Sequence, residues 1–324
     1  MESPTALKAL FEDRIAEIRE QEDWSGTLYA PMAYILRLGG KRVRPMLLLL
    51  TYQALSGRSA AEALNAAAAV ELFHNFTLIH DDIMDNAPKR RNQPTVHEKW
   101  DVNTAILAGD AMFAVAVDYM VRDFPEKAGP LTREFMRVSV GVCEGQMEDM
   151  DMAEAEGASI AEYIEMIRKK TAMLIGGAMS IGAIAAGALP GVVRDIYAYG
   201  EAVGIGFQLQ DDYLDVYAEQ AKFGKQVAGD ILENKKTFLL IRAMEKSSPA
   251  QSQRLEQLLF EEADDQRKIA GVKAIYAELD IPAETRAHSE TYFNRADALS
   301  EVLSTQPGFA QIDTFLQALM KREY

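Results

Sequence analysis

Cysteine is almost absent from this sequence, whose 324 residues contain only one, Cys143. A single cysteine excludes an intramolecular disulfide and a zinc site built from several cysteines. Positive charge is also in short supply, because 34 lysines and arginines stand against 49 aspartates and glutamates, which gives a net charge of −15. Nucleic acid and anionic membrane surfaces repel such a chain, so we expect neither as a partner.

Charge is missing altogether between residues 171 and 193. This stretch is longer than the roughly 20 residues that span a membrane, but it is rich in alanine and glycine and contains Pro190. We interpret it as a tightly packed interior helix and expect no stable membrane insertion. The N-terminus has early acidic residues and no apolar signal segment, which predicts a cytoplasmic protein.

Apolar residues recur at helical spacing along most of the chain, for example from residue 6 to 22 and from 131 to 150. The segment from Pro249 onward continues as charged amphipathic helices with breaks near Pro282 and Pro307. Nothing in the segments 105–116 and 131–150 requires a strand, and no repeat of fixed 20- to 50-residue period is present. The pattern therefore predicts an all-α protein, and the length allows one large domain or two.

Two acidic motifs of the same form each follow an apolar run and supply six aspartates: Asp81, Asp82 and Asp85, then Asp211, Asp212 and Asp215. On a helix, Asp81 and Asp85 lie one turn apart on the same face, while Asp82 points about 100° away. Such oxygen ligands suit Mg²⁺, which takes one or two carboxylates and fills its other positions with water and phosphate oxygens. The duplication predicts two facing helices that line one cavity, and the metal predicts a phosphorylated substrate.

Cations accompany both acidic motifs: Lys41, Arg42 and Arg44 precede the first, Arg90 and Arg91 follow it, Lys169 and Lys170 precede the second, and Lys225, Lys235 and Lys236 follow it. Gly39 and Gly40 free the backbone to turn, and Pro45 suits the first turn of the next helix. Cations beside a helix start can hold an anion, although an ordinary basic turn has the same composition. Arginines beside metal-binding carboxylates can complete a diphosphate site through bidentate bonds.

The histidines allow a zinc interpretation, but His74, His80 and His97 lack partners at ligand spacing. His80 is expected to be a packing residue or a support for Asp81. His74 lies two helical turns before Asp81 on nearly the same face, so it either reaches a substrate or is a satisfied core histidine.

These motifs resemble those of the trans-isoprenyl diphosphate synthases, or polyprenyl synthetases, and they occur in the same order. They are GGKRVRP at 39–45, HDDIMD at 80–85, the arginine pair followed by Pro94 and Thr95, Lys170 with Thr171, FQLQDDYLD at 207–215, and the lysines at 225 and 235. The resemblance implies a single domain over residues 1–324, folded as a helical bundle around a deep central cavity and assembled as a homodimer.

The resemblance also implies a role for each matching residue. The expected Mg²⁺ ligands are Asp81, Asp85 and Asp211, with Asp82, Asp212 and Asp215 as ligands or supporting carboxylates. Contacts to an allylic diphosphate are expected from Arg90, Lys170, Thr171 and Lys225, with Lys235 as an auxiliary contact. The expected pocket for isopentenyl diphosphate consists of Lys41, Arg44, His74 and Arg91, and Phe207 and Gln208 are expected near the reacting carbons. The directly catalytic set would be Asp81, Asp85, Lys170, Gln208, Asp211 and Lys225.

The implied reaction is the condensation of isopentenyl diphosphate with dimethylallyl, geranyl or farnesyl diphosphate. Its cofactor would be Mg²⁺, with three ions per active site and Mn²⁺ as a substitute. Breaking the allylic carbon–oxygen bond leaves a carbocation and a diphosphate, so the site must neutralise the departing charge. One departure from the family pattern is Asn92, which stands where glycine usually follows the arginine pair.

Product length is expected to depend on Phe76 and Thr77, five and four residues before Asp81. Both should lie about one helical turn, roughly 6–8 Å, deeper than the metal site. Bulk at this depth forms a floor for the growing chain in similar enzymes. A single aromatic at Phe76 with the small Thr77 beside it predicts geranylgeranyl diphosphate as the product, with farnesyl diphosphate or a longer product as alternatives.

Other classes of protein explain part of this pattern. A terpene cyclase also ionises allylic diphosphates, but its second metal motif is of a different type and it needs no second diphosphate pocket. A non-catalytic subunit of a heteromeric prenyl synthase generally loses acidic motifs, and this chain keeps both. A structural, Ca²⁺-binding helical protein would explain the carboxylates but not the ordered basic clusters.

Overall fold

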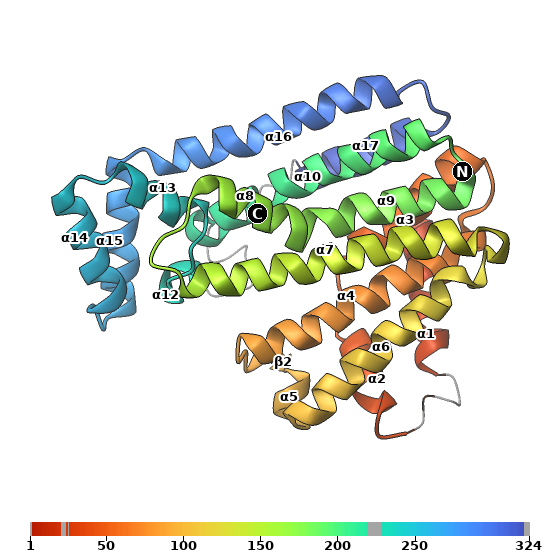
Figure 1. The fold of residues 1–324 in the computed structure, drawn as a ribbon, viewed down its shortest axis with the longest axis horizontal. Helices are drawn as coiled ribbons and strands as arrows, with labels where there is room; N and C mark the ends of the chain where they lie inside the picture. The colour runs from red at the N-terminus through yellow and green to blue at the C-terminus, as the bar shows by residue number, and fades with distance from the viewer. Residues whose placement is uncertain (1, 21–23, 25, 219–227, 321–324) are drawn as a thin grey trace. The chain divides into compact units, whose positions relative to one another are not determined.

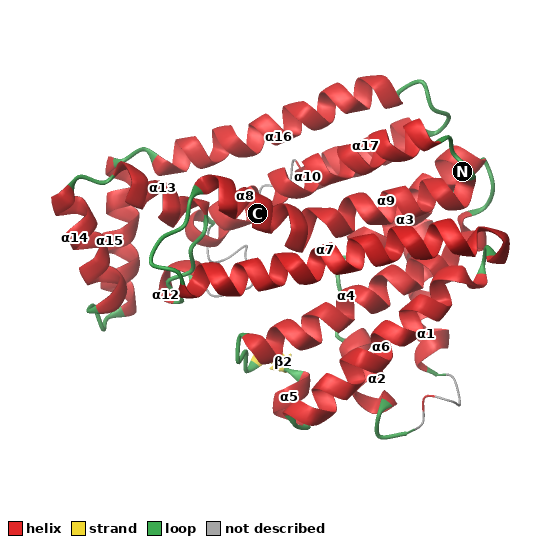
Figure 2. Ribbon diagram, viewed as in Figure 1, coloured by secondary structure: helices red, strands yellow, loops and turns green. Residues whose placement is uncertain are grey.

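Helices make up nearly all of the computed structural model, which describes residues 2–20, 24, 26–218 and 228–320 (Figure 2). Within these residues the only strands are β1 (Lys89–Arg90) and β2 (Gln93–Pro94), which pair antiparallel as a hairpin. The predicted all-α fold is confirmed. The hairpin was not predicted, because two-residue strands are too short to produce an alternating pattern.

The elements are drawn in chain order in Figure 1. Up to the middle of the chain the helices are α1 (Pro4–Arg19), α2 (Tyr29–Arg37), α3 (Val43–Ser56), α4 (Leu64–Met84), α5 (Val96–Lys99), α6 (Val102–Arg122) and α7 (Ala128–Glu154), with 3-10 turns η2 (Ala60–Ala63) and η3 (Pro125–Lys127). They are followed by α8 (Ile160–Ile167), the π-turn η4 (Arg168–Ala172), α9 (Met173–Ala186), α10 (Pro190–Tyr217), α12 (Gly229–Leu232), α13 (Phe238–Lys246), α14 (Pro249–Phe260), α15 (Asp265–Glu278), α16 (Ile281–Leu303) and α17 (Phe309–Met320).

The chain divides into two compact units. Unit 1 consists of Met1–Val140, Leu174–Tyr197 and Glu301–Phe315, and unit 2 of Gly141–Met173, Ala198–Ser300 and Leu316–Tyr324. Helices α7, α10, α16 and α17 each continue from one unit into the other. The single domain expected over residues 1–324 stays a prediction, and the two units are described in turn.

The core of unit 1 is built around α4, which packs along α6 and against α3 (Figure 1). Four consecutive alanines of α4, residues 66–69, are fully buried. Alanine is the strongest helix former and its short side chain lets a neighbouring helix approach closely. The apolar run that precedes the first acidic motif is thus a rigid interior helix.

The uncharged stretch from residue 171 to 193 contains the end of the π-turn, all of α9 and the start of α10 rather than one long helix. Ala178, Met179, Ile181 and Ala183 of α9 are completely buried, which confirms the predicted interior helix. Close packing fixes Gly182 as glycine, because a Cβ there would lie 2.5 Å from the backbone oxygen of Leu48 in α3. The lack of charge in this stretch therefore reflects packing in the protein interior.

A different helix, α6, has the length and apolar content of a membrane span, and 39% of its most apolar window is buried. No other helix in the described part of the chain meets these two criteria. Ala105, Ala108 and Met112 on one side of α6 are fully buried, as in the core helix of a globular protein.

Unit 2 has two apolar clusters. One is formed by residues of α10, α12, α13, α14 and α15, including Leu239, Leu255 and Val272. The other joins the end of α7, α8, α10 and α13 around Tyr163, Leu209 and Phe238. Both clusters contain residues of α10, so the second acidic motif is carried by a helix that is fixed on several sides.

Candidate active site

The first acidic motif lies at the C-terminal end of α4, where the buried helix becomes exposed to solvent. Asp85 caps the helix, and its backbone N–H donates to the Asp81 carbonyl oxygen at 2.9 Å. This hydrogen bond confirms that Asp81 and Asp85 are one helical turn apart. Asp81 is half-buried and Asp85 is exposed.

Asp82 has a different environment, because it is 1% exposed and points toward the arginine hairpin. Its two oxygens accept hydrogen bonds from Arg90, from Nε at 2.9 and 3.1 Å and from Nη2 at 2.8 Å. Such a bidentate pair fixes both the guanidinium and the carboxylate. Of the two roles expected for Asp82, this geometry favours the supporting carboxylate, which orients Arg90.

The hairpin that carries the arginine pair turns at Arg91 and Asn92. Both residues have positive φ, 52° and 62°. A two-residue hairpin of this kind needs left-handed backbone at both central positions, and asparagine tolerates it better than any residue except glycine. Asn92 therefore preserves the turn that glycine would make.

The guanidinium of Arg91 lies over the glycine turn that precedes α3. A Cβ added to Gly40 would be 3.0 Å from Nη2 of Arg91, so a side chain at Gly40 would crowd the arginine. Gly39 has φ 75°, the left-handed conformation for which glycine is suited. Lys41 is exposed on the same turn. The turn that carries Lys41 and the hairpin that carries Arg91 are far apart in the sequence but lie next to each other in unit 1.

Arg44 and His74 also belong to this basic cluster. Nη1 of Arg44 is 3.3 Å from Nε2 of His74. Burial, followed by the charges of nearby arginines, holds the pKa of His74 well below its ordinary value. A neutral imidazole can accept a hydrogen bond from Arg44, so the two side chains form a polar pair. Lys41, Arg44, His74 and Arg91 therefore lie in one region of unit 1, as the resemblance implied.

Arg42 is not part of this basic cluster, which corrects the expectation that it acts with Lys41 and Arg44. Its side chain is buried and donates to Glu71 at 2.5 Å, to Glu12 at 3.0 Å and to the backbone oxygen of Leu36 at 3.1 Å. A buried guanidinium with three acceptors is satisfied. Arg42 therefore joins α1, α2 and α4 and has a structural role.

Phe76 lies on the side of α4 that faces α6. Its ring stacks on Phe113 at a centroid distance of 5.4 Å and meets the His80 ring edge-on at 4.7 Å. His80 is thus a packing residue, as expected. Thr77 shares a helix face with Asp81, and its hydroxyl donates to the His74 carbonyl oxygen. The depth expected for both residues stays a prediction, and their side chains point in different directions.

The second acidic motif lies on the part of α10 that belongs to unit 2. Asp212 is buried, accepts a short hydrogen bond from the Tyr163 hydroxyl and accepts another from Gln208 at 3.0 Å. Burial raises the pKa of Asp212 to about 6, against the opposing effect of these donors. Both oxygens of Asp212 are thus occupied by neighbouring side chains, which again favours a supporting role.

Gln208 connects this carboxylate to the π-turn. While its Nε2 donates to Asp212, its Oε1 accepts from the Thr171 hydroxyl at 3.0 Å. The amide can neither rotate nor shift without breaking both bonds. Phe207 is half-buried on the same helix. The expected neighbours Gln208, Thr171 and the second motif are therefore brought together.

Asp215 organises the start of the segment after α10. Its Oδ2 accepts from the backbone N–H of Asp230 at 2.9 Å, and its carbonyl oxygen accepts from Ala228 at 2.7 Å. Burial and nearby carboxylates raise the pKa of Asp230 to about 7, while Lys235 opposes the shift. Asp211 is half-buried on α10, and Lys235 is exposed close to these acids. Lys225, which the resemblance also selects, lies outside the described residues.

Lys170 lies in the π-turn η4, where the helix takes a wider path for one turn. Its Nζ forms an ion pair with Asp149 of α7 at 2.5 Å. Gly145 of α7 permits this approach, since a Cβ there would lie 2.3 Å from the backbone nitrogen of Lys170. Single π-turns inside helices are frequent at functional sites. Lys170 is therefore held at a fixed direction beside the second motif.

The donor set fits Mg²⁺. No group of three His, Cys, Asp or Glu side chains converges on one point in the described part of the chain. Mg²⁺ needs only one or two carboxylates and takes its remaining ligands from water and phosphate. Asp81 and Asp85 of unit 1, and Asp211 of unit 2, are exposed or half-buried carboxylates of the kind that would hold such ions.

Three residues of these networks were not selected from the sequence: Tyr163, Asp149 and Asp230. Asp230 follows a glycine after the second motif, and Asp149 lies in a run of acidic residues, but neither pattern is distinctive. Tyr163 is 49 positions from Asp212. Only the packing of α8 against α10 identifies it as a partner.

This fold, with acidic helix ends supported by arginine, lysine and tyrosine, is that of a polyprenyl synthetase. The polyprenyl synthetase family model matches residues 25–279, and the chain belongs to this family.

Particular relatives are similar over most of the chain. The chain is 42% identical to a geranylgeranyl pyrophosphate synthase of Geoglobus acetivorans over 73% of its length and 74% of the relative. It is 35% identical to a short chain isoprenyl diphosphate synthase of Methanothermobacter thermautotrophicus over 92% of its length and 91% of the relative. A crystal structure of geranylgeranyl pyrophosphate synthase superposes with a TM-score of 0.92 at 39% identity and covers 100% of both chains.

Proposed function

We propose that the protein is a Mg²⁺-dependent trans-prenyltransferase that joins isopentenyl diphosphate to an allylic diphosphate, with geranylgeranyl diphosphate as its main product. Dimethylallyl, geranyl and farnesyl diphosphate are the proposed allylic substrates. Each condensation adds one five-carbon unit and releases diphosphate and a proton. The observation that carries the proposal is the pair of acidic helix ends, on α4 and α10, each with exposed or half-buried aspartates beside a buried, hydrogen-bonded one.

Asp81, Asp85 and Asp211 are the proposed ligands of Mg²⁺, with three ions per active site. Bound Mg²⁺ would supply positive charge to the oxygens of the allylic diphosphate as this group departs. The buried Asp82 and Asp212 contribute indirectly. Their hydrogen bonds with Arg90, Tyr163 and Gln208 fix the helix ends that carry the other aspartates.

Lys170 and Arg90 are proposed to bind the allylic diphosphate, together with Lys225 and, as an auxiliary contact, Lys235. Each of these cations stabilises negative charge that grows when the carbon–oxygen bond breaks. The ion pairs Lys170–Asp149 and Arg90–Asp82 hold the first two in position before substrate arrives. Prearranged cations need not reorganise in the transition state.

Lys41, Arg44 and Arg91 are proposed to bind the diphosphate of isopentenyl diphosphate, with His74 as a neutral partner. The two arginines offer planar donor groups that match phosphate oxygens. Phe207 and the fixed amide of Gln208, with Thr171 behind it, are proposed to lie along the reacting carbons.

The final step removes a proton from the newly joined chain. Burial and four arginines lower the pKa of His74, so its imidazole is a weak base. We therefore assign this proton to an oxygen of the departing diphosphate, the acceptor proposed for the family.

A second proposal concerns assembly as a homodimer. Val102, Ile106 and Leu107 of α6 are 46%, 40% and 59% exposed. Apolar side chains that gather on one helix face outside the core are typical of an interface with another protein.

The direct test is a product assay with purified protein, Mg²⁺, isopentenyl diphosphate and each allylic substrate in turn, read by mass spectrometry. A twenty-carbon diphosphate as the main product is expected. Fifteen carbons, or thirty and more, would keep the reaction and refute the proposed chain length. Absence of product from folded protein would refute the enzyme and favour a non-catalytic subunit. Asp81→Asn, which removes a proposed Mg²⁺ ligand, is the matched negative control.

A further inference from the structure

The hydroxyl of Tyr163 binds a carboxylate of the second acidic motif inside unit 2. Tyr163 of α8 is 2% exposed, and its hydroxyl donates to Oδ2 of Asp212 on α10. Burial, followed by the negative charge of Asp212, holds the pKa of Tyr163 well above its ordinary value. The tyrosine therefore keeps its proton and remains a donor to this carboxylate.

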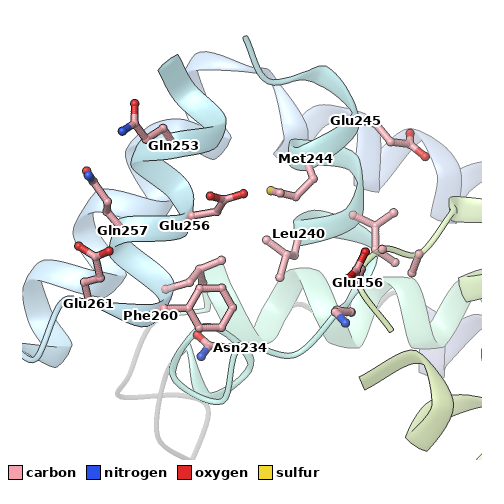
Figure 3. Close-up of a pocket in the computed structure, with 15 residues that line it drawn as sticks. Glu156, Asn234, Leu240, Met244, Glu245, Gln253, Glu256, Gln257, Phe260 and Glu261 are labelled. Atoms are coloured by element: carbon pink, nitrogen blue, oxygen red, sulfur yellow. The ribbon is translucent and has the colours of Figure 1, made fainter. Parts of the chain in front are cut away.

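The ring of Tyr163 is held by apolar packing that does not involve the hydroxyl. It belongs to the cluster of α7, α8, α10 and α13 that includes Phe238. Another side of α13 lines a pocket of about 590 Å³, into which Leu240 and Met244 point (Figure 3). Neither Tyr163 nor Asp212 lines that pocket. Replacing Tyr163 with phenylalanine should thus keep the ring in place and remove only the hydroxyl.

A chain of hydrogen bonds continues from Asp212 to the π-turn. Its Oδ1 accepts from Nε2 of Gln208 at 3.0 Å, and Oε1 of Gln208 accepts from the Thr171 hydroxyl at 3.0 Å. Gln208 and Asp212 are four residues apart, so they share one face of α10. The segment formed by α8 and the π-turn is therefore attached to this face at two points, through Tyr163 and through Thr171.

The π-turn brings both attachment points onto the same side of their segment. Each residue of a regular α-helix turns by about 100°, so Tyr163 and Thr171, eight residues apart, would point about 80° apart. The π-turn at Arg168–Ala172 takes up one extra residue, which reduces this difference to about 20°. Two bonds to one face of α10 are compatible with this arrangement and not with a regular helix.

Two attachment points on one face fix the rotation of α10 about its own axis. Asp211 is the neighbour of Asp212 and lies about 100° away around the helix, so the same bonds set its direction. Lys170 precedes Thr171 in the π-turn and forms an ion pair with Asp149 at 2.5 Å. The chain of hydrogen bonds thus relates the direction of a proposed Mg²⁺ ligand to that of a proposed diphosphate contact.

We propose that Tyr163 is a positioning residue for the prenyl transfer. Its hydroxyl holds Asp212 and, through Gln208, the Thr171 end of the π-turn, so that Asp211 and Lys170 act on the same allylic diphosphate. Tyr163 itself touches neither substrate nor Mg²⁺ in this role. The inference rests on the proposed prenyltransferase function, and the experiment separates the two.

Tyr163→Phe removes the hydroxyl and leaves one oxygen of the buried Asp212 without this donor. We expect the Mg²⁺ concentration for half-maximal turnover to rise, and kcat to fall, each by about five- to thirty-fold. The KM for isopentenyl diphosphate should stay unchanged, because its proposed contacts belong to unit 1 and not to this chain of bonds. Steady-state kinetics with each substrate and with Mg²⁺ varied in turn measure all three quantities.

Calorimetry provides a readout that needs no turnover. Farnesyl thiolodiphosphate, whose sulfur makes the allylic bond harder to ionise, should bind Tyr163→Phe about five- to thirty-fold more weakly than the parent in the presence of Mg²⁺. A parent protein without turnover would refute the proposed function, and the affinity for the analogue would still decide the role of Tyr163. Equal affinity of parent and variant, with an equal Mg²⁺ requirement where there is turnover, would overturn the positioning role.

A double variant tests whether the effect passes along the chain of bonds. Thr171→Val breaks the far end and should also raise the Mg²⁺ requirement. Tyr163 and Thr171 are linked through Asp212 and Gln208, so Thr171→Val should cost less in the Tyr163→Phe background than in the parent. Strictly additive effects of the two substitutions would overturn the proposed route.

The matched control is Tyr276→Phe, which removes the hydroxyl of another tyrosine of unit 2 that is 2% exposed. It should leave kcat, the Mg²⁺ requirement and the affinity for the analogue as in the parent. Equal losses in Tyr163→Phe and Tyr276→Phe, or an equal rise in the KM for isopentenyl diphosphate with Tyr163→Phe, would indicate a general loss of structure and overturn the role. Circular dichroism melting curves establish that each variant is folded.

Discussion

Asn92 occupies a backbone conformation that most side chains avoid, and this gives the residue a testable role. Asn92→Val places a β-branched side chain at φ 62°, which costs roughly 1–2 kcal/mol, whereas Asn92→Gly removes the strain. Because the turn positions Arg91, we expect Asn92→Val to raise KM for isopentenyl diphosphate by about 5- to 30-fold. Steady-state kinetics on both substrates measure this. Unchanged KM values in the valine variant would refute the role, and Asn92→Gly should behave as the parent does.

The raised pKa of Asp230 predicts how the free energy of unfolding depends on pH. Its folded-state pKa of about 7 exceeds the unfolded value of about 3.9, so the folded protein binds this proton more tightly. The free energy of unfolding should therefore fall as pH rises through 7, and Asp230→Asn should abolish that part of the fall. Between pH 6 and 8 the variant should gain about 1 kcal/mol over the parent, measured by urea unfolding with EDTA.

The exposed carboxylate Glu290 provides the control for this measurement. Glu290→Gln should show no such gain between the two pH values. If the free energy of unfolding changes with pH in the same way for Asp230→Asn and Glu290→Gln, Asp230 does not titrate between pH 6 and 8.

Single residues also mark the limit of the sequence interpretation. Arg42 and Arg44 are two positions apart in one basic motif, and nothing local distinguishes them. Arg42 is buried because Glu12 and Glu71, which are about 30 positions away on either side, accept its hydrogen bonds. Periodicity predicted that Asp81 and Asp85 share a face, since this depends on the helix alone. Partners such as Tyr163 depend on how helices pack, which spacing does not encode.

At the scale of the element, α4 sets the proposed floor of the product cavity through Phe76. Phe76→Ala should lengthen the main product by at least one five-carbon unit, because it removes an aromatic ring about one turn below Asp81. Phe113 stacks on this ring, so Phe113→Leu should lengthen products to a smaller extent. Mass spectrometry of the products measures the chain length for each variant. Phe124→Leu, a change in a buried aromatic that packs with Tyr52 instead, should leave product length unchanged.

Elements were predicted from the sequence more reliably than side-chain networks. The interior position of α9 followed from its lack of charge, and Met179 and Ile181 are fully buried. The π-turn between α8 and α9 was not predicted, because the residues from Arg168 to Ala172 fit an ordinary helix equally well. Its backbone lies close against Gly145 of α7, a contact between helices that the local sequence does not indicate.

At the scale of the whole molecule, the exposed face of α6 predicts the oligomeric state. Light scattering should give a mass of twice 35.9 kDa for the parent. Leu107→Glu places a charge on this face and should shift the protein toward the monomer. Leu189 is 74% exposed on a loop, so Leu189→Glu is a control that should stay dimeric. A parent protein that is monomeric at all concentrations would exclude the homodimer.

The π-turn at Arg168–Ala172 has a consequence for how the chain tolerates changes in length. Such a turn contains one residue more than an α-helix of equal rise, so it is equivalent to an insertion within a regular helix. Deleting Lys169 should restore a regular helix with little loss of helical content by circular dichroism. The deletion should nevertheless abolish turnover, because it turns the Lys170 ammonium away from Asp149. A deletion variant that keeps full turnover would show that the extra residue has no catalytic purpose.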